Sequence, residues 1–134
     1  MVGFVVITHG KLAGELISTA EDIVGKLDKV KGLSIPRGCP HDEARELISA
    51  TIKSVDNGDG VLILTDLFGG TPSNLSISFL KEHKVEVVTG VNLPMMIKLS
   101  SVKQNMLLDD LAQYIQSYGR ENISIAGRLL KETA

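Results

Sequence analysis

The chain has 134 residues, of which 43% are hydrophobic and 22% are charged, and its formal net charge at pH 7 is −2. This length and composition fit a single domain, residues 1–134, with enough apolar side chains for a hydrophobic core. A slightly acidic chain with 4% aromatic residues and no tryptophan lacks the basic patch and the stacking side chains of nucleic-acid-binding proteins, so no nucleic acid is expected as a partner.

The cellular compartment is indicated by the single cysteine and by the N-terminal segment. Cys39 has no second cysteine with which to form a disulfide within the chain, which favours a reducing environment. The apolar segment 2–7 is too short for a secretory signal or a membrane span, and no basic residues precede it. We therefore expect a cytoplasmic protein.

Short apolar segments alternate with amphipathic segments along the chain. The short segments are rich in β-branched residues and predict strands at 2–7, 30–35, 61–65 and 85–89, with a last short strand at 123–126. Apolar residues at helical spacing predict helices at 12–27, 44–55, 75–80, 95–101 and 107–118, the last ended by Gly119.

This alternation predicts an α/β fold in three layers, with helices on both faces of a four-stranded parallel sheet. The segments 2–7 and 61–65 are nearly continuous apolar runs, as expected for strands that are covered on both faces.

Polar residues and glycines follow each of the four predicted parallel strands. Ligands of open parallel sheets bind outside the carboxyl ends of the strands, and these loops all lie at that edge. Six polar side chains of these loops are therefore expected to converge: His9, Arg37, Asp66, Thr71, Ser73 and Asn92.

His9 and Asp66 form the most informative pair. A carboxylate that accepts the N–H of one ring nitrogen fixes the imidazole tautomer and leaves the other nitrogen as an aimed lone pair, able to act as a base, a metal ligand or a nucleophile. Each residue alone also has a structural interpretation, since His9 could be a satisfied structural histidine and Asp66 could cap the turn before Pro72. The position of His9 after a buried strand favours the functional interpretation.

The glycine-rich segment after Asp66 predicts a phosphate site. Gly69 and Gly70 allow the backbone to approach a ligand, although two glycines alone are more often a tight turn. Thr71 and Ser73 add hydroxyl donors at the start of a helix, and Gly10 creates a similar helix start behind His9. Together these residues predict a nucleophilic histidine that faces an anion.

Neither a cofactor nor a metal is expected. The nucleotide-binding patterns G-x-x-x-x-G-K-[ST] and G-x-G-x-x-G do not occur. Cys39 and His41 without further ligands are weak support for a metal site, and a cap of the second helix is the better interpretation of His41. The roles of Arg37, Cys39 and His41 remain unassigned by the sequence.

Three ordered motifs, VVITHGKLAGELISTAEDIVG, GVLILTDLFGGTPSN and VVTGVNLPMMIK, resemble the mannose-type enzyme IIA domains of the bacterial phosphoenolpyruvate:sugar phosphotransferase system (PTS). The similarity spans the whole chain and includes the terminal GRENISI. The resemblance implies that His9 accepts phosphate from the histidine of HPr and passes it to an enzyme IIB. It also implies that Asp66 orients His9 and that Thr71 and Ser73 belong to the wall of the phosphate site.

The resemblance further implies a homodimer in which the strand at 123–126 crosses to the partner's sheet and runs antiparallel at its edge. Because the chain ends at Ala134, we expect the enzyme IIB to be a separate chain, with membrane permease subunits as indirect partners. Five residues would surround a docking surface for HPr and enzyme IIB: Phe68, Asn92, Leu93, Pro94 and Met95. Asn92 has an alternative role as a helix N-cap, and Met95 has one in the core.

The expected function is a cytoplasmic phosphocarrier for sugar uptake, which is a phosphotransferase. A regulatory module that signals the state of the PTS to a protein partner, without sugar transport, would use the same residues. A small-molecule enzyme with His9 and Asp66 as acid and base is a third interpretation. The sequence carries no indication of the sugar, because an enzyme IIA domain contacts phosphoproteins and never the sugar.

Overall fold

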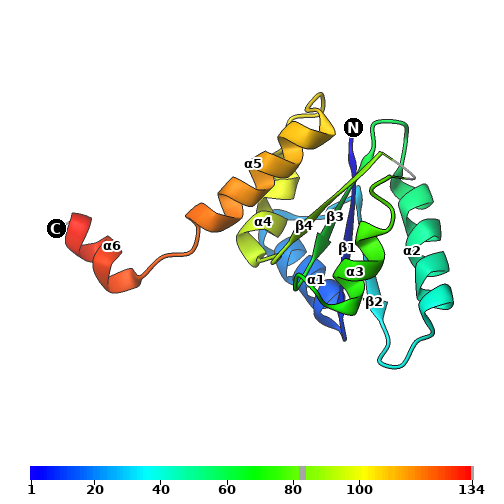
Figure 1. The fold of residues 1–134 in the computed structure, drawn as a ribbon. Helices are drawn as coiled ribbons and strands as arrows, with labels where there is room; N and C mark the ends of the chain where they lie inside the picture. The colour runs from blue at the N-terminus through cyan, green and yellow to red at the C-terminus, as the bar shows by residue number, and fades with distance from the viewer. Residues whose placement is uncertain (82–83, 134) are drawn as a thin grey trace.

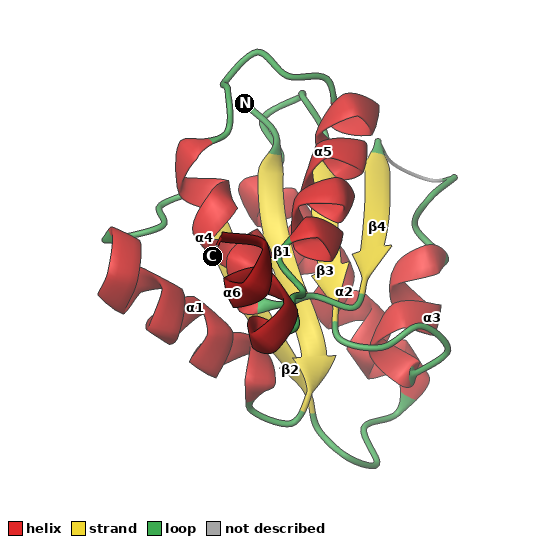
Figure 2. Ribbon diagram, turned by 90° about the vertical axis from the view of Figure 1, so that its left-hand side faces the viewer, coloured by secondary structure: helices red, strands yellow, loops and turns green. Residues whose placement is uncertain are grey.

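A four-stranded sheet forms the centre of the structure, a computed structural model that describes residues 1–81 and 84–133 (Figure 1). Its strands lie in the order β2-β1-β3-β4 and all neighbours pair in parallel, so their carboxyl ends share one edge (Figure 2). The strands are β1 (Gly3–His9), β2 (Val30–Ile35), β3 (Val61–Thr65) and β4 (Val85–Thr89). The predicted parallel α/β sheet is therefore confirmed.

Helices cover both faces of this sheet (Figure 1). On one face lie α1 (Leu12–Val24), α4 (Leu93–Lys98) and α5 (Leu108–Glu121), with a short 3-10 helix, η1 (Leu99–Ser101), after α4. On the other face lie α2 (His41–Val55) and α3 (Thr71–Ile77). A last helix, α6 (Ala126–Thr133), follows α5. None of the helices in the described ranges is long and apolar enough to cross a membrane.

Alternate residues of the central strands enter two separate cores, which explains the continuous apolar runs in the sequence. Phe4 and Val6 of β1 pack with the α1, α4 and α5 side, whereas Val5 and Ile7 pack with the α2 and α3 side. Successive side chains of a strand point to opposite faces, so a strand buried on both faces must be apolar at every position.

The strand order places the loops after β1 and β3 next to each other. The chain passes from β1 to the edge strand β2 and then returns to the other side of β1 as β3, with Ile7 opposite Thr65. After β1 the chain enters α1 on one face, and after β3 it enters α3 on the other face. Such a switch point opens a crevice at the carboxyl edge, where ligands of α/β sheets bind.

The C-terminal part of the chain differs from the prediction. Residues 123–125 link α5 to α6, and Ala126 begins α6, so the predicted strand at 123–126 does not form. A strand needs a neighbour that pairs with its backbone, and this segment lies away from the chain's own sheet (Figure 1). The antiparallel edge strand and its exchange between two copies therefore stay a proposal.

Gly119 does not end α5, contrary to the prediction, and the helix continues to Glu121. The Met95 side chain packs where a Cβ of Gly119 would lie. This glycine therefore serves close packing between α4 and α5.

We predict that Gly3→Ala destabilises the fold. A Cβ at Gly3 would lie 2.8 Å from Val55 Cγ2 and closer still to the Val55 carbonyl oxygen, which cannot rotate away. Overpacking of this kind lowers the free energy of unfolding by about 1–3 kcal/mol. Urea unfolding of both proteins measures the difference. The control is Gly14→Ala in α1, where a Cβ meets nothing within 4 Å and stability is expected to stay equal or to rise. Equal stability of the two variants would contradict the prediction.

Candidate functional site

His9 is placed at the carboxyl edge of the sheet by the end of β1. The six residues before it in the strand are buried, and His9 is the first exposed one. Gly10 follows with φ +53°, a left-handed conformation that favours glycine and turns the chain toward α1. The buried strand therefore supplies a rigid support for an exposed imidazole.

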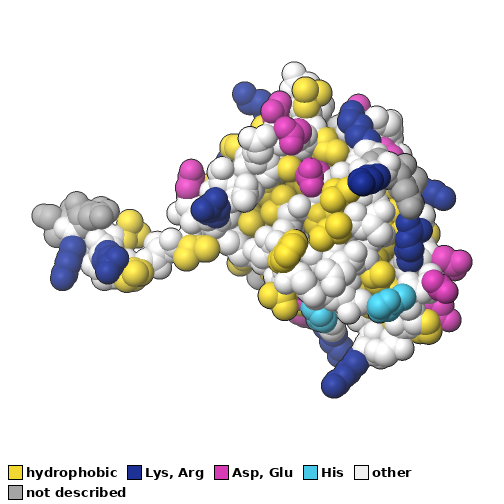
Figure 3. Space-filling view, in the orientation of Figure 1, with side chains coloured by type: hydrophobic (Ala, Val, Ile, Leu, Met, Phe, Trp, Pro, Cys, Tyr) yellow, Lys and Arg dark blue, Asp and Glu magenta, His cyan; other side chains and the backbone are white. Residues whose placement is uncertain are grey.

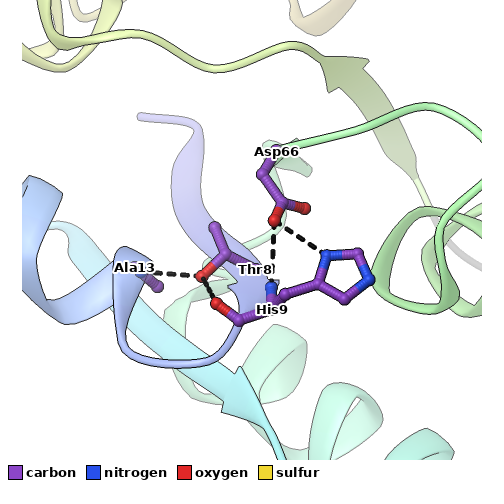
Figure 4. A network of polar contacts seen from close by, with 4 residues as sticks. All are labelled: Thr8, His9, Ala13 and Asp66. Carbon is purple, nitrogen blue, oxygen red and sulfur yellow. Dashed lines mark hydrogen bonds and ion pairs between the residues drawn. The ribbon is translucent and has the colours of Figure 1, made fainter.

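Asp66, the residue after β3, holds the His9 ring (Figure 4). Its Oδ2 lies 2.8 Å from His9 Nδ1 and also accepts the backbone N–H of His9 at 3.1 Å. An ionised carboxylate can only accept, so the Nδ1 atom carries the proton and Nε2 keeps its lone pair. The predicted convergence of His9 and Asp66 is therefore present, with Nε2 as the free ring nitrogen.

The electrostatics of the pair keep Asp66 ionised. Burial raises the pKa of Asp66, but the hydrogen bonds from the His9 ring and backbone outweigh this effect and hold the pKa below its ordinary value. The Asp66 side chain is 15% exposed, whereas the His9 side chain is 52% exposed. The pair thus presents a nucleophilic nitrogen to solvent above a shielded carboxylate.

Thr8 supports the pair from below, a role that sequence reasoning missed. Its side chain is fully buried, and its hydroxyl accepts the Ala13 N–H at 2.7 Å while donating to the His9 carbonyl at 3.1 Å (Figure 4). These bonds tie the first turn of α1 to the end of β1. The signal in the sequence was a polar residue at the end of an apolar strand, directly before His9.

The two glycines after Asp66 shape the loop in different ways. A Cβ at Gly70 would lie 2.6 Å from His9 Cε1 and 3.2 Å from Nε2, so the missing side chain makes room for the ring. The Gly70 N–H donates to the Leu67 carbonyl at 3.3 Å and is therefore not free for an anion. Gly69 has φ +87° and its carbonyl accepts from Asn74, which closes the loop.

A cavity of about 510 Å³ lies beside the His9 ring. Its walls come from three loops at the carboxyl edge, those after β1, β2 and β3. Besides His9 it is lined by Gly10, Arg37, Cys39, His41 and Thr71. The structure thus brings Arg37 and Thr71 to the same cavity as His9, as predicted from their positions at the carboxyl edge of the sheet.

Ser73 does not fit the expected role in phosphate binding. Its side chain is fully buried, and its Oγ has no hydrogen-bond partner among the described residues. The reason is the orientation of α3, whose buried face consists of Pro72, Ser73 and Ser76. Thr71, one residue before Pro72, is exposed and lines the cavity instead.

Asn92 and Met95 serve the structure of α4. Asn92 is the N-cap of α4, accepting the Met95 N–H at 3.1 Å and donating to the Gly119 carbonyl at 3.1 Å. Met95 is 4% exposed and packs in the core, so the expected docking role does not fit its burial. The alternative interpretations, an N-cap and a core residue, describe these two positions.

In the loop after Asp66, the apolar side chains of Leu67 and Phe68 are 59% and 73% exposed. Leu93 and Pro94 are half-buried at the start of α4. Of the expected docking residues, Phe68 is therefore the one whose side chain is freely accessible. No group of three or more potential metal ligands occurs within the described ranges.

The chain is similar to known PTS components. A family model described as "PTS system fructose IIA component" matches residues 3–116. The mannose-specific EIIAB component of Escherichia coli is 32% identical over 125 residues, covering 91% of this chain, and the match covers 38% of that protein's length.

Solved structures of PTS components have the same fold. A crystal structure of the EIIA component from Streptococcus agalactiae has a TM-score of 0.86 and 26% identity, covering 96% of this chain and 99% of that chain. The IIA protein associated with the fucose utilization operon of Streptococcus pneumoniae has a TM-score of 0.81 and 28% identity, with the same shares covered.

We predict that Asp66→Asn lowers the free energy of unfolding at pH 7 by on the order of 1 kcal/mol, because the amide loses a charge-assisted hydrogen bond at a partly solvated site. The pKa of Asp66 in the folded protein lies below the ordinary 3.8, so on acidification the unfolded chain takes up the proton first. The stabilisation is therefore complete above about pH 4 and is lost as the pH falls through the folded pKa.

Urea unfolding of both proteins at neutral and at strongly acidic pH measures this effect. The difference in the free energy of unfolding between wild type and Asp66→Asn should disappear on acidification, because the two proteins share all other titrating groups. A difference in the free energy of unfolding that stays constant down to strongly acidic pH would contradict the assigned role of the Asp66 carboxylate.

Proposed function

The chain belongs to the mannose-type family of PTS enzyme IIA components, and we propose that it is a phosphocarrier that works through His9. It accepts a phosphoryl group from HPr on His9 Nε2 and passes it to an enzyme IIB. The observation that carries this proposal is the 2.8 Å hydrogen bond from His9 Nδ1 to Asp66, which leaves Nε2 as an exposed nucleophile beside a cavity.

The transfer is a substitution at phosphorus. The Nε2 lone pair attacks the phosphorus of the donor's phosphohistidine, and the donor's P–N bond breaks as the new one forms. The electron pair of the broken bond returns to the donor imidazole. His9 becomes a phosphorylated imidazolium, whose positive charge is stabilised by the Asp66 carboxylate at Nδ1–H. Transfer to enzyme IIB runs the same step in reverse, with Nε2 as the leaving group.

The cavity beside Nε2 is the proposed phosphoryl site. Thr71 is exposed there and supplies a hydroxyl donor, and Gly10 leaves the approach open. Gly69 provides the turn of the loop and Gly70 provides the space for the ring. Ser73 is left out of this site because its hydroxyl is buried.

HPr and enzyme IIB are the proposed partners, and they would dock on the apolar residues of the loop after β3 and of the start of α4, at the edge of the sheet that carries His9. Phe68 is two residues from Asp66 and is 73% exposed, and Leu67 beside it is 59% exposed. Leu93 and Pro94 lie at the same edge of the sheet, in the first turn of α4, which follows β4. Transfer between two proteins requires an accessible nucleophile, and the half-exposed His9 ring satisfies this requirement.

A homodimer is the proposed assembly. Ile123 and Ile125 are 75% and 60% exposed in the segment between α5 and α6. A second cavity, of about 600 Å³, lies over the edge strand β4 and is lined by Ile77, Val87 and Ala112, among others. Hydrophobic side chains gather over this region between α3 and α5 (Figure 3). We propose that residues 123–126 of one copy pair with β4 of the other, which covers Ile123, Ile125 and the part of the cavity wall formed by Val87 and Ala112.

We predict that His9→Ala accepts no label from radioactive phosphoenolpyruvate in the presence of enzyme I and HPr, because the attacking nitrogen is gone. His41→Ala is the matched control, since His41 lines the same cavity and should leave labelling intact. Autoradiography after gel electrophoresis measures the label. Labelling of His9→Ala at the wild-type level would overturn the proposal. A label that no enzyme IIB removes would favour a regulatory module over a carrier for sugar uptake.

We predict that the protein is a dimer of 14.4 kDa chains and that replacing both Ile123 and Ile125 by Asp makes it monomeric. Charged side chains would have to be buried against β4 of the second copy, which is unfavourable. Analytical ultracentrifugation measures the mass. Ile23→Asp, at a 58% exposed position of α1, should stay dimeric. A monomeric wild-type protein at micromolar concentration would refute the assembly.

A further inference from the structure

We propose that Arg37 binds the phosphoryl group directly during its transfer to and from Nε2 of His9. This inference rests on the proposed phosphocarrier function and deepens it. It assigns the loop after β2, which neither the sequence motifs nor the comparisons connect with the chemistry. The juxtaposition of Arg37 and His9 in one cavity is the starting observation.

Arg37 lies in a separate wall of that cavity from Thr71. Arg37 comes from the loop between β2 and α2, whereas Thr71 comes from the start of α3. His9 and Gly10 supply the wall between them, because β1 lies between β2 and β3 in the sheet. A phosphoryl group on Nε2 in this cavity would therefore have the Thr71 hydroxyl and the Arg37 guanidinium as donors from two loops.

The backbone around Arg37 forms a defined turn. The Cys39 N–H donates to the Pro36 carbonyl at 3.1 Å, and Gly38 has φ +81°, which places Arg37 and Gly38 at the two central positions of a type II turn. Pro36 and Pro40 on either side restrict the backbone further. Little backbone entropy is therefore lost when this turn presents a side chain to a ligand.

Both ends of the turn are anchored in the core. Ile35 is 6% exposed, and Cys39 packs against the apolar cluster on the α2 side of the sheet. Arg37 itself is exposed at the tip. Since both ends are held, the backbone of Arg37 is fixed in the wall of the cavity, and its exposed side chain extends from that fixed point.

The charge balance of the site calls for such a cation. A phosphoryl group carries roughly −1.5 to −2 charges near neutral pH, and the site already holds the Asp66 carboxylate. Among the described residues, Arg37 is the one Lys or Arg side chain that lines the cavity. It forms no ion pair with a carboxylate in the described ranges, so its guanidinium is available.

The guanidinium fits the requirement better than an ammonium would. Its planar N–H groups can donate two parallel hydrogen bonds to two phosphoryl oxygens. In the transfer step Arg37 keeps its protons and forms no covalent bond. It donates to the non-bridging oxygens while the P–N bond to the donor breaks and the P–N bond to His9 forms, and the same contacts remain in phosphorylated His9.

The experiment compares wild type, Arg37→Gln, Arg37→Lys and a charge-matched control, Lys53→Gln. Lys53 is exposed in the last turn of α2, at the opposite edge of the sheet from His9. The first measurement is the single-turnover rate of phosphoryl transfer from phosphorylated HPr. Arg37→Gln should slow transfer about 100-fold, as is usual for the loss of one donor to a developing oxyanion. Arg37→Lys should recover part of the rate, and Lys53→Gln should match wild type.

The second measurement separates a contact with the phosphoryl group from a contact with HPr. Each variant is phosphorylated to completion, HPr is removed, and the ³¹P resonance of phosphorylated His9 is recorded. With no donor protein present, a shifted resonance in Arg37→Gln and an unshifted one in Lys53→Gln support the proposal. A wild-type resonance in Arg37→Gln overturns it, even if transfer is slow, because Arg37 would then be a docking residue.

Failure of the phosphocarrier function gives a different result. Wild-type protein that accepts no phosphate from HPr would refute the proposed function, and the role of Arg37 with it. Wild-type protein that is labelled on His9, together with unchanged rate and resonance in Arg37→Gln, would refute the role of Arg37 alone.

Discussion

The hydrogen bond between His9 Nδ1 and Asp66 Oδ2 is the interaction on which the site depends. It joins residues that are 57 positions apart in the chain and places the carboxylate at Nδ1, so that Nε2 is the ring nitrogen that keeps its lone pair. The bond exists because β1 and β3 are neighbours and Ile7 pairs with Thr65, so that Asp66 follows β3 beside the last residues of β1. The same carboxylate oxygen also accepts the His9 backbone N–H, so the ring and its backbone are held by one acceptor.

The order of the strands turns this pair into an accessible site. Because β1 lies between β2 and β3, the loops on both sides of His9 belong to different crossover connections. One brings Gly70, whose missing side chain admits the ring, and the other brings Arg37. The cavity is thus a consequence of the strand order, which brings these loops together around His9.

In the pair of His9 and Asp66, the imidazole is exposed to solvent and the carboxylate is largely shielded from it. A carrier that receives a group from one protein and gives it to another must let both reach the same atom, which the half-exposed imidazole allows. The carboxylate below is largely shielded and stays ionised, so the ring keeps its orientation through each exchange. The exposed Phe68, two residues after Asp66, is apolar surface available to the proposed partners.

Local patterns in the sequence were sufficient to predict the parallel α/β fold class, the four strands and the pairing of His9 with Asp66. Apolar runs, helical spacing and the polar residues after each strand are all short-range signals, and parallel strands must share an edge. Which face of a short helix is buried depends on the sheet it packs against. For this reason only the tertiary structure placed Ser73 inside and put Met95 against Gly119, and it decided between the two roles that the sequence allowed for Asn92.

The C-terminal segment, residues 123–126, shows most clearly what the sequence determines and what the tertiary structure decides. Ile123 and Ile125 carry the apolar alternation of a strand, but a strand forms only where another backbone offers hydrogen bonds. The chain's own sheet does not offer them to this segment, and residues 123–125 remain a link to α6. The sequence by itself therefore determined which segments favour strands, while the tertiary structure decided which of them find a neighbour, because pairing is a contact between distant parts of a chain.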